Sequence, residues 1–376
     1  MRIRYGVVLL LLSILVMCGC SRDSEKEEVT STSVVSATAT QSHAPEEVSG
    51  PKGEGVQEIT LMTHDSFSVS AGVIALFEKA HNAKVVFLKA GDAGEALNKA
   101  ILSRNNPLAD LFYGVDNTFL SRALAADMFI PRPSLHLSDV DDSLELDPSH
   151  ALVPVDFGDV CLNYDRAWFK IHDIQPPTML DDLVKPQYKG LLVVENPATS
   201  SPGLAFLLAT ISRFGEDGYL NFWKQLKFND VLITSGWKEA YWGKFSAASD
   251  GDRPLVVSYA SSPAAEVFYA KEKPAQSPTG VVIGHGSAFR QIEFAGILKG
   301  TDQEALAGEL LDFLLSPSFQ ADIPLQMFVF PANNKAVLPE VFQKHASITQ
   351  EPATLSSDLI QSRRDLWLGQ WTELML

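Results

Sequence analysis

The chain has 376 residues, of which 46% are hydrophobic and 20% are charged, so it contains enough apolar side chains for two lobes or one large domain. Its formal net charge of −16 argues against nucleic acids and anionic lipid headgroups as partners, because both bind basic surfaces. Cys161 is the only cysteine beyond residue 20, so the folded part has no internal disulfide.

The first twenty residues have the pattern of an export signal. Two arginines precede an apolar run, residues 7–16, which is too short to span a bilayer as a helix. The run ends in Met-Cys-Gly-Cys-Ser (residues 17–21) and resembles bacterial lipoprotein signals, in which a small residue precedes the modified cysteine. We predict a signal peptide over 1–20 and a lipid on Cys20, whose two acyl chains form a stable membrane anchor. Cys18 is the alternative, and an ordinary cleaved signal with incidental cysteines is the competing interpretation.

Residues 21–57 contain no aromatic side chain and are rich in Ser, Thr, Glu, Val and Ala. Such a segment buries too little apolar surface to offset its ordering entropy, so we predict a disordered tether. The globular part is expected to begin near Glu58, and no later stretch has the length of a transmembrane helix.

From Glu58 onward, short apolar runs alternate with helical patterns. Strands are predicted at residues 59–63, 84–88, 109–113, 191–195, 231–233, 255–259 and 281–284. Helices are predicted at residues 72–80, 94–103, 117–125, 203–214, 219–227, 237–245 and 304–315. This alternation predicts βαβ units and mostly parallel sheets.

Residues 151–163 form a long extended stretch in mid-chain, which suits a strand that crosses between two lobes, and residues 280–297 suit the return. We therefore predict an α/β fold with two lobes, each a mostly parallel sheet flanked by helices, joined by two crossover strands. Lobe 1 comprises 58–154 plus 286–376, and lobe 2 comprises 155–285. A cleft is expected between the carboxyl ends of the strands of the two lobes.

Four polar turns follow or adjoin predicted strands, at residues 63–67, 91–94, 199–203 and 258–263. In the last two, a serine precedes a proline at the start of a helix, so the backbone N–H groups and hydroxyls there suit a polar or anionic ligand atom. Simple helix capping is the alternative for any one turn. The occurrence of all four at the same sheet edges favours a binding cleft.

Aromatic side chains provide a second indication of a ligand site. Trp237 begins a predicted helix and Tyr259 ends a predicted strand, and we expect both to contact ligand. We predict core packing for Trp223, Tyr241 and Trp242.

The sequence lacks common enzyme and metal motifs. It has no G-x-S-x-G of serine hydrolases, no H-E-x-x-H of zinc proteases, and neither a Walker loop nor a G-x-G-x-x-G after a strand for nucleotide binding. Its eight histidines have no metal-ligand spacing. Cys161 lies in an apolar strand pattern and is expected to be a buried small hydrophobe. We therefore predict a protein that is not an enzyme and has no metal or cofactor.

Seven segments in order resemble the thiamine-binding protein family, the extracytoplasmic receptors of thiamine ABC importers. They are T-H-D-S-F (63–67), G-V-D-N (114–117), V-D-F-G (155–158), N-P-A-T-S-S-P-G-L (196–204), T-S-G-W-K-E-A-Y (234–241), V-V-S-Y-A-S-S-P (256–263) and L-L-S-P-S-F-Q-A-D-I-P (314–324). The resemblance covers the chain from Glu58 almost to its end. It implies a two-lobed type II periplasmic-binding-protein fold.

The family's binding residues match this sequence at Asp92, Ala93, Ser200, Ser201, Trp237, Tyr259, Ala260, Ser261 and Ser262. Asp65, Asp116 and Asp156 are expected nearby as further sources of negative charge. The chain departs from its relatives at His64, Ala71, Ala265 and Phe328, where the family has larger or different aromatic residues. We include His64 and Phe328 in the predicted site.

The resemblance implies an exported, lipid-anchored, monomeric receptor that binds thiamine or a thiamine phosphate between its lobes and delivers it to the permease of an ABC importer. Each stacking or cation–π contact contributes about 0.5 to 2 kcal/mol, so the missing aromatics leave the ligand's identity open. The alternatives are a receptor of this fold for another cationic or phosphorylated solute, and a thiaminase that uses Cys161.

Overall fold

The protein is described by a computed structural model covering residues 55–376, so the signal peptide, Cys20 and the tether up to residue 54 lie outside the described residues. The strands are β1 Gln57–Thr63, β2 Ala83–Lys89, β3 Leu111–Asp116, β4 Phe129–Ile130, β5 Val153–Asp165, β6 Leu192–Glu195, β7 Leu232–Thr234, β8 Leu255–Tyr259, β9 Thr279–Val282, β10 Phe289–Leu298 and β11 Phe330–Pro331.

The α-helices are α1 Ala71–His81, α2 Ala93–Leu102, α3 Leu120–Ala125, α4 Arg166–Ile171, α5 Ser201–Phe214, α6 Tyr219–Phe228, α7 Trp237–Glu239, α8 Ser262–Tyr269, α9 Glu304–Leu315, α10 Pro317–Gln320, α11 Ile323–Gln326, α12 Glu340–His345 and α13 Ser357–Met375. Four short 3-10 helices (Leu137–Asp139, Asp142–Leu144, Leu180–Val184 and Pro186–Tyr188) and a π-helix, η5 Ala240–Lys244, complete the elements. Within residues 55–376, no helix combines the length and the apolar character that crossing a bilayer demands.

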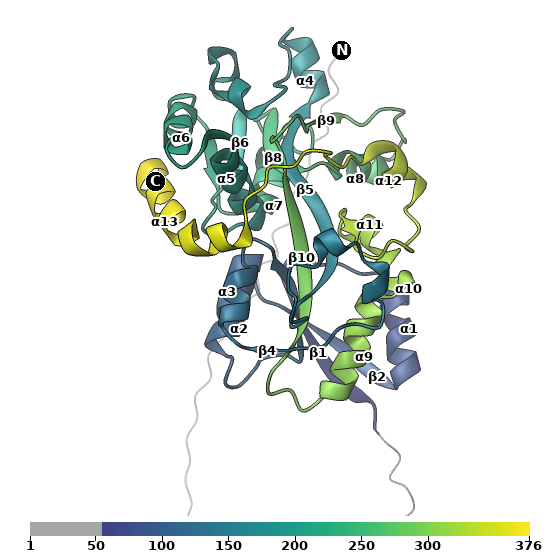
Figure 1. Ribbon diagram of the computed structural model, residues 1–376. Coiled ribbons are helices and arrows are strands. Elements are labelled where there is room, and N and C mark those ends of the chain that lie inside the picture. Colours follow the sequence, from purple (N-terminus) through teal and green to yellow (C-terminus); the bar gives the residue numbers. More distant parts are fainter. Residues whose placement is uncertain (1–54) are drawn as a thin grey trace, which may run out of the picture. The chain divides into compact units, whose positions relative to one another are not determined.

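The strands form one sheet, in which eight follow the order β2-β1-β3-β10-β5-β8-β6-β7, β4 pairs with β10, and β9 and β11 pair with β5. At one end β1 pairs in parallel with β2 and β3, and at the other β6 pairs in parallel with β7 and β8. The central strands β5 and β10 are antiparallel to their neighbours and run side by side between the two ends (Figure 1). The predicted α/β class is confirmed.

Two of the parallel strands, β3 and β6, and much of the helix α5 are buried along their whole width. Every residue of β3 and β6 is buried, and residues 201–211 of α5 are buried as well. Continuous apolar runs of this kind are typical of strands and helices with no solvent-facing side.

The long strand β5 connects the two ends of the sheet. Its residues 153–160 pair with β10, and residues 160–164 pair with β8. The predicted return at residues 280–297 contains two strands, β9 and β10, separated by an irregular stretch.

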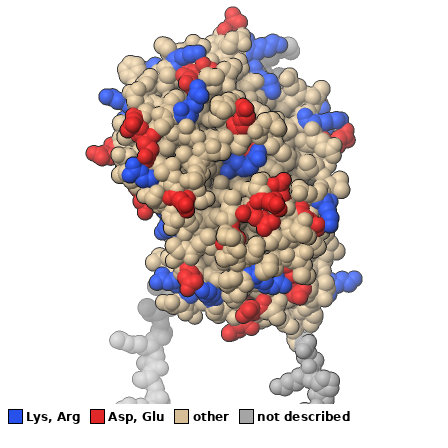
Figure 2. Space-filling model, in the orientation of Figure 1, with Lys and Arg blue, Asp and Glu red and all other residues tan. Residues whose placement is uncertain are grey.

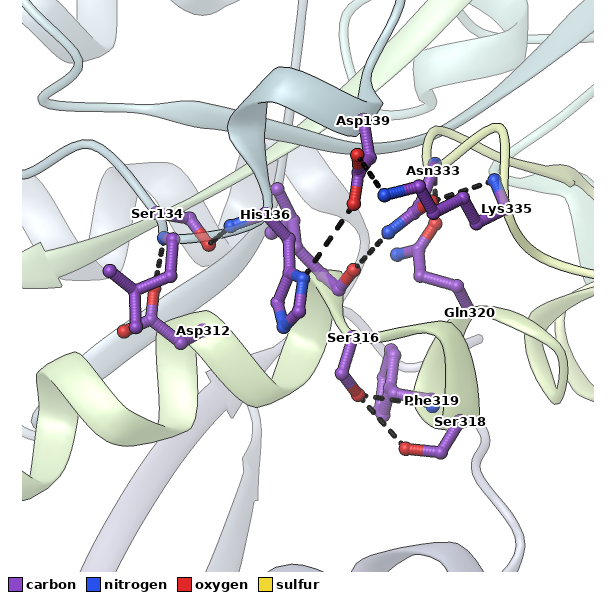
Figure 3. Close-up of polar contacts among 12 residues, drawn as sticks. Ser134, His136, Asp139, Asp312, Ser316, Ser318, Phe319, Gln320, Asn333 and Lys335 are labelled. Carbon is purple, nitrogen blue, oxygen red and sulfur yellow. Dashed lines mark hydrogen bonds and ion pairs between the residues drawn. The ribbon is translucent and has the colours of Figure 1, made fainter.

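The buried amides of Gln320 and Asn333, which Figure 3 shows with neighbouring polar contacts, connect the segment after α9 to β5. The side chain of Gln320 donates hydrogen bonds to the carbonyls of Val155 (2.9 Å) and Leu314 (2.7 Å), and its oxygen accepts one from the backbone N–H of Asn333 (3.0 Å). The Asn333 side chain donates to the carbonyl of Leu315 at 2.7 Å. These bonds hold Asn333, just after β11, and the helix α10 beside β5.

Candidate ligand-binding site

A cavity of about 630 Å³ lies where loops from several strand ends meet. All four polar turns identified in the sequence contribute to it, through residues 64–66, 92–93, 199, 201, 202, 259 and 262. Further lining comes from the two central strands β5 and β10, from the segment after β7, and from residues 326–329 before β11. The position agrees with the general location of ligand sites at the carboxyl ends of strands in α/β sheets.

Ten of the predicted site residues line this cavity. They are His64, Asp65, Asp92, Ala93, Asp156, Ser201, Trp237, Tyr259, Ser262 and Phe328.

The other four predicted site residues, Asp116, Ser200, Ala260 and Ser261, lie outside the lining. Asp116 is buried and accepts a hydrogen bond from the backbone N–H of Thr118 at 2.7 Å. The Ser261 hydroxyl donates to the carbonyl of Phe328, and Ala260 is wholly buried. Ser200 is buried, so its hydroxyl faces the interior. Of these four residues, Ser261 is thus bonded to a residue of the cavity lining.

The two helices that begin at serine–proline pairs start one residue earlier than a serine cap before the helix would give. The helices α5 and α8 begin at Ser201 and Ser262 themselves, and neither preceding serine makes a side-chain cap bond. The Ser262 hydroxyl instead lies 2.9 Å from that of Ser258 and accepts a bond from the backbone N–H of Tyr259 at 3.3 Å. The first helical residue, rather than the capping residue, therefore faces the cavity.

Two aromatic side chains are fixed in the cavity wall by hydrogen bonds. The indole Nε1 of Trp237 donates to the Ser258 hydroxyl at 2.9 Å, and its ring stacks on Tyr241 with centroids 5.0 Å apart. The Tyr259 hydroxyl donates to Oε1 of Gln291 at 3.2 Å. Each ring is held in one orientation, which lowers the entropic cost of binding a flat ligand.

The prediction that Trp223, Tyr241 and Trp242 pack in the core is confirmed in part. Trp223 is wholly buried in the core. Tyr241 is buried, although its ring also lines the cavity. The prediction is wrong for Trp242, which is 51% exposed and lines the cavity, because η5 is a π-helix rather than part of a regular α-helix.

The cavity lining is strongly acidic. Its carboxyl groups belong to Asp65, Asp92, Glu95, Asp156, Glu239 and Glu293. Lys238 is the one lysine or arginine among the described lining residues, and Nε2 of His64 lies 3.3 Å from Oε1 of Glu293. By contrast, acidic and basic side chains are interspersed on the molecular face in Figure 2. This imbalance favours a ligand with a positive charge.

Burial perturbs the acid groups of the site. Desolvation raises the pKa of Asp92, and it raises the pKa of Asp156 well above its usual range, with the nearby Glu293 carboxyl adding to the effect. Behind the lining, burial also raises the pKa of Asp116 to about 7 and that of Glu195 well above its usual range. A cationic ligand would favour the ionised forms of these groups.

Sequence reasoning missed several lining residues. Gln291 and Glu293 come from β10, and Lys238, Trp242 and Tyr269 come from the segment after β7 and from the end of α8. The sequence did offer an indication that Glu293 has a special role, because it is the only acidic residue in the apolar strand pattern Gln-Ile-Glu-Phe-Ala-Gly-Ile-Leu, residues 291–298.

Cys161 does not contribute to the cavity. Its side chain is wholly buried, and burial raises the pKa of its thiol. A nucleophilic cysteine needs a lowered pKa and access to substrate, and Cys161 has neither. Among the described residues, no group of three or more His, Cys, Asp or Glu side chains is placed to hold a metal ion.

Comparisons of the sequence and of the structure with known proteins all point to solute-binding proteins. The family model described as bacterial extracellular solute-binding protein matches residues 106–349. The thiamine-binding periplasmic proteins of Salmonella typhimurium and Escherichia coli are each 30% identical, over 324 and 320 residues, covering 83% of this chain and 92% of each relative. A solved structure of a periplasmic thiamin binding protein, 26% identical, superposes with a TM-score of 0.74 and covers 87% of this chain and 99% of that one. This likeness confirms the predicted type II periplasmic-binding-protein fold.

Proposed function

Because this chain belongs to the family of bacterial extracellular solute-binding proteins, we propose that it binds thiamine or a thiamine phosphate in the cavity and delivers it to the permease of an ABC importer. One observation carries the choice of ligand: an acidic lining surrounds the fixed aromatic faces of Trp237 and Tyr259. The relatives named for thiamine add support from sequence.

The chemistry of thiamine suits this lining. Its pyrimidine and thiazolium rings are flat, and the thiazolium carries a fixed positive charge. Trp237 and Tyr259 supply π faces, and Asp92 with Asp65 and Asp156 supplies negative charge. The hydroxyethyl or phosphate end would lie near Ser201 and Ser262, where α5 and α8 begin.

We further propose that the molecule closes on its ligand by a hinge motion between lobe 1 (58–154 plus 286–376) and lobe 2 (155–285). The pairing of β5 with β10 at one end and with β8 at the other supports β5 as one of the two connecting strands. The cavity lining, which draws residues from both proposed lobes, is consistent with closure around a ligand.

The proposed receptor acts outside the cytoplasmic membrane as a monomer, held by a lipid on Cys20. Expression with a radiolabelled fatty acid tests the anchor. Wild-type protein should be labelled and Cys20→Ser protein should not, whereas equal labelling of Cys20→Ser with loss in Cys18→Ser would assign the lipid to the other cysteine.

Mass spectrometry of the protein purified under native conditions identifies the ligand directly. Competition calorimetry with thiamine, its mono- and diphosphate, spermidine and ferric ion then ranks the candidates. Saturable binding of spermidine or ferric ion without binding of thiamine would favour the second candidate, a receptor of this fold for another cationic solute. Consumption of thiamine during incubation with a nucleophilic base would contradict a receptor that performs no catalysis.

A further inference from the structure

We propose that Trp242 and Tyr269 form an aromatic rim that stacks on the flat cationic ligand at the mouth of the cavity and sets the receptor's preference for aromatic cations. The inference deepens the proposed function and rests on it. Both residues line the cavity, yet they are 51% and 63% exposed, so the two rings present free faces.

A π turn is the reason that Trp242 reaches the cavity. The backbone N–H of Phe245 donates to the carbonyl of Ala240 at 3.0 Å, a bond across five residues rather than four. In a regular α-helix, Tyr241 would lie about 40° around the axis from Trp237, and Trp242 would lie about 140° away. A π turn contains an additional residue, so positions four and five after Trp237 both lie beside it.

The ring contacts agree with this geometry. Trp237 stacks on Tyr241, and Trp242 meets both rings edge to face, with centroids 6.2 Å from Trp237 and 5.0 Å from Tyr241. The three rings form one continuous wall from the buried Tyr241 to the exposed Trp242. π-Helical turns are rare and frequently occur at functional sites.

The helix α8, which carries Tyr269, is connected to the same wall through a hydrogen bond of Glu266. The Tyr241 hydroxyl donates to Oε1 of Glu266 at 2.5 Å, and Glu266 also accepts from the Ser277 hydroxyl at 2.7 Å. Trp242 follows Tyr241 directly, and Tyr269 lies one turn after Glu266 in α8. The hydrogen bond therefore links η5, which carries Trp242, to α8, which carries Tyr269.

Phe328 supports the phenol of Tyr269 from the segment before β11. Their ring centroids are 5.3 Å apart, and Phe328 itself lines the cavity. The lining position in α8 one residue before Glu266 is Ala265, which offers no ring. The aromatic surface on this side of the cavity therefore comes from Tyr269 and Phe328.

Calorimetric titration of the full-length protein with thiamine tests the rim. We expect Trp242→Ala and Tyr269→Ala each to weaken binding about 3- to 30-fold, because each removes one stacking or cation–π contact. Trp242→Phe, which keeps an aromatic face, should bind within about threefold of wild type. The control is Phe228→Ala, which removes a ring that is 77% exposed but lies outside the cavity lining, and it should leave the affinity unchanged.

The outcomes separate the rim from the proposed function. If the wild-type protein binds thiamine and both alanine variants match it, the rim is overturned and the function stands. If Trp242→Phe loses as much affinity as Trp242→Ala, the indole acts through something other than its aromatic face, and the stacking role is overturned. If the wild-type protein does not bind thiamine, the function and the rim fail together.

Discussion

The hydroxyl of Ser258 accepts a 2.9 Å hydrogen bond from the indole of Trp237 and lies 2.9 Å from the hydroxyl of Ser262. Ser258 is wholly buried in β8, whereas Trp237 and Ser262 line the cavity from two different helices. One buried hydroxyl therefore sets the relative position of an aromatic face and a polar group in the proposed binding site.

The variant Ser258→Ala should weaken thiamine binding about 3- to 10-fold, because it releases the indole from its fixed orientation. The free energy of unfolding should fall by about 1 kcal/mol. Calorimetric titration measures the affinity, and denaturant unfolding measures the stability.

The core offers a matched control, because Trp223 donates to the buried hydroxyl of Thr210 at the same distance, 2.9 Å. Thr210→Val should lower the stability by a comparable amount and leave thiamine affinity unchanged. Equal affinity losses in Ser258→Ala and Thr210→Val would show that loss of stability, rather than indole orientation, weakens binding.

Asp116 should make the empty protein less stable as the pH rises. Burial raises its pKa from 3.8 to about 7, so between these values the native state binds more protons than the unfolded state. The free energy of unfolding contributed by this group therefore falls with increasing pH across that window. Asp116→Asn imitates the protonated acid at every pH, and the carboxamide oxygen still accepts from the N–H of Thr118.

Denaturant unfolding of both proteins at a series of pH values checks this effect. The advantage of Asp116→Asn over wild type should grow from about pH 4 and level off above about pH 7, reaching on the order of 4 kcal/mol. Burial alone would lower the pKa of His64, but the nearby Glu293 carboxylate favours the charged imidazole, and the pKa is raised. His64 therefore also makes the protein less stable as the pH rises. A difference between the two proteins that does not vary with pH would exclude this role for Asp116.

Thiamine affinity should have the opposite pH dependence. Burial raises the pKa of Asp92, so this carboxyl keeps its proton to a higher pH than a typical aspartate, and a cationic ligand binds better once the proton is lost. Affinity should therefore increase with pH, and binding should release protons. Calorimetry in two buffers with different ionisation enthalpies measures the release.

Asp92→Asn separates charge from structure in this experiment. The Asp92 side chain accepts from the backbone N–H of Ala93 at 2.7 Å where α2 begins, and asparagine preserves that acceptor. The variant should bind thiamine about tenfold more weakly at high pH, with a flatter pH dependence. An unchanged pH profile would assign the titration to Asp156 instead, whose pKa burial also raises.

The four polar turns were predictable from the sequence because parallel strands end at the same edge of a sheet. Each turn could be located from the apolar run before it, so residues 64 and 259 could be expected to share one cavity although they are far apart in the chain. The long strand β5 was recognisable for the same reason, since an extended apolar stretch of that length suits few other elements.

Other features depend on tertiary structure that local patterns do not contain. Glu293 lies in β10, where a strand pattern does not reveal which face meets the cavity. Trp242 lies within the π-helix η5, and the sequence of residues 237–245 fits an α-helix equally well. The helix α13 was not predicted because its buried stripe contains Arg364 between Ile360 and Trp367, which interrupts the apolar period.

Cys161 should be unreactive in the native protein. Its thiol is wholly buried and burial raises its pKa, so almost no thiolate exists at neutral pH to attack a substrate or an alkylating reagent. Iodoacetamide should therefore modify the peptide that contains Cys161 only after denaturation, as followed by mass spectrometry of the digested protein. Cys161→Ser should bind thiamine within about twofold of wild type, because the side chain lies outside the cavity lining. Rapid alkylation of native Cys161, or thiamine consumption that Cys161→Ser abolishes, would instead support the cysteine-dependent thiaminase.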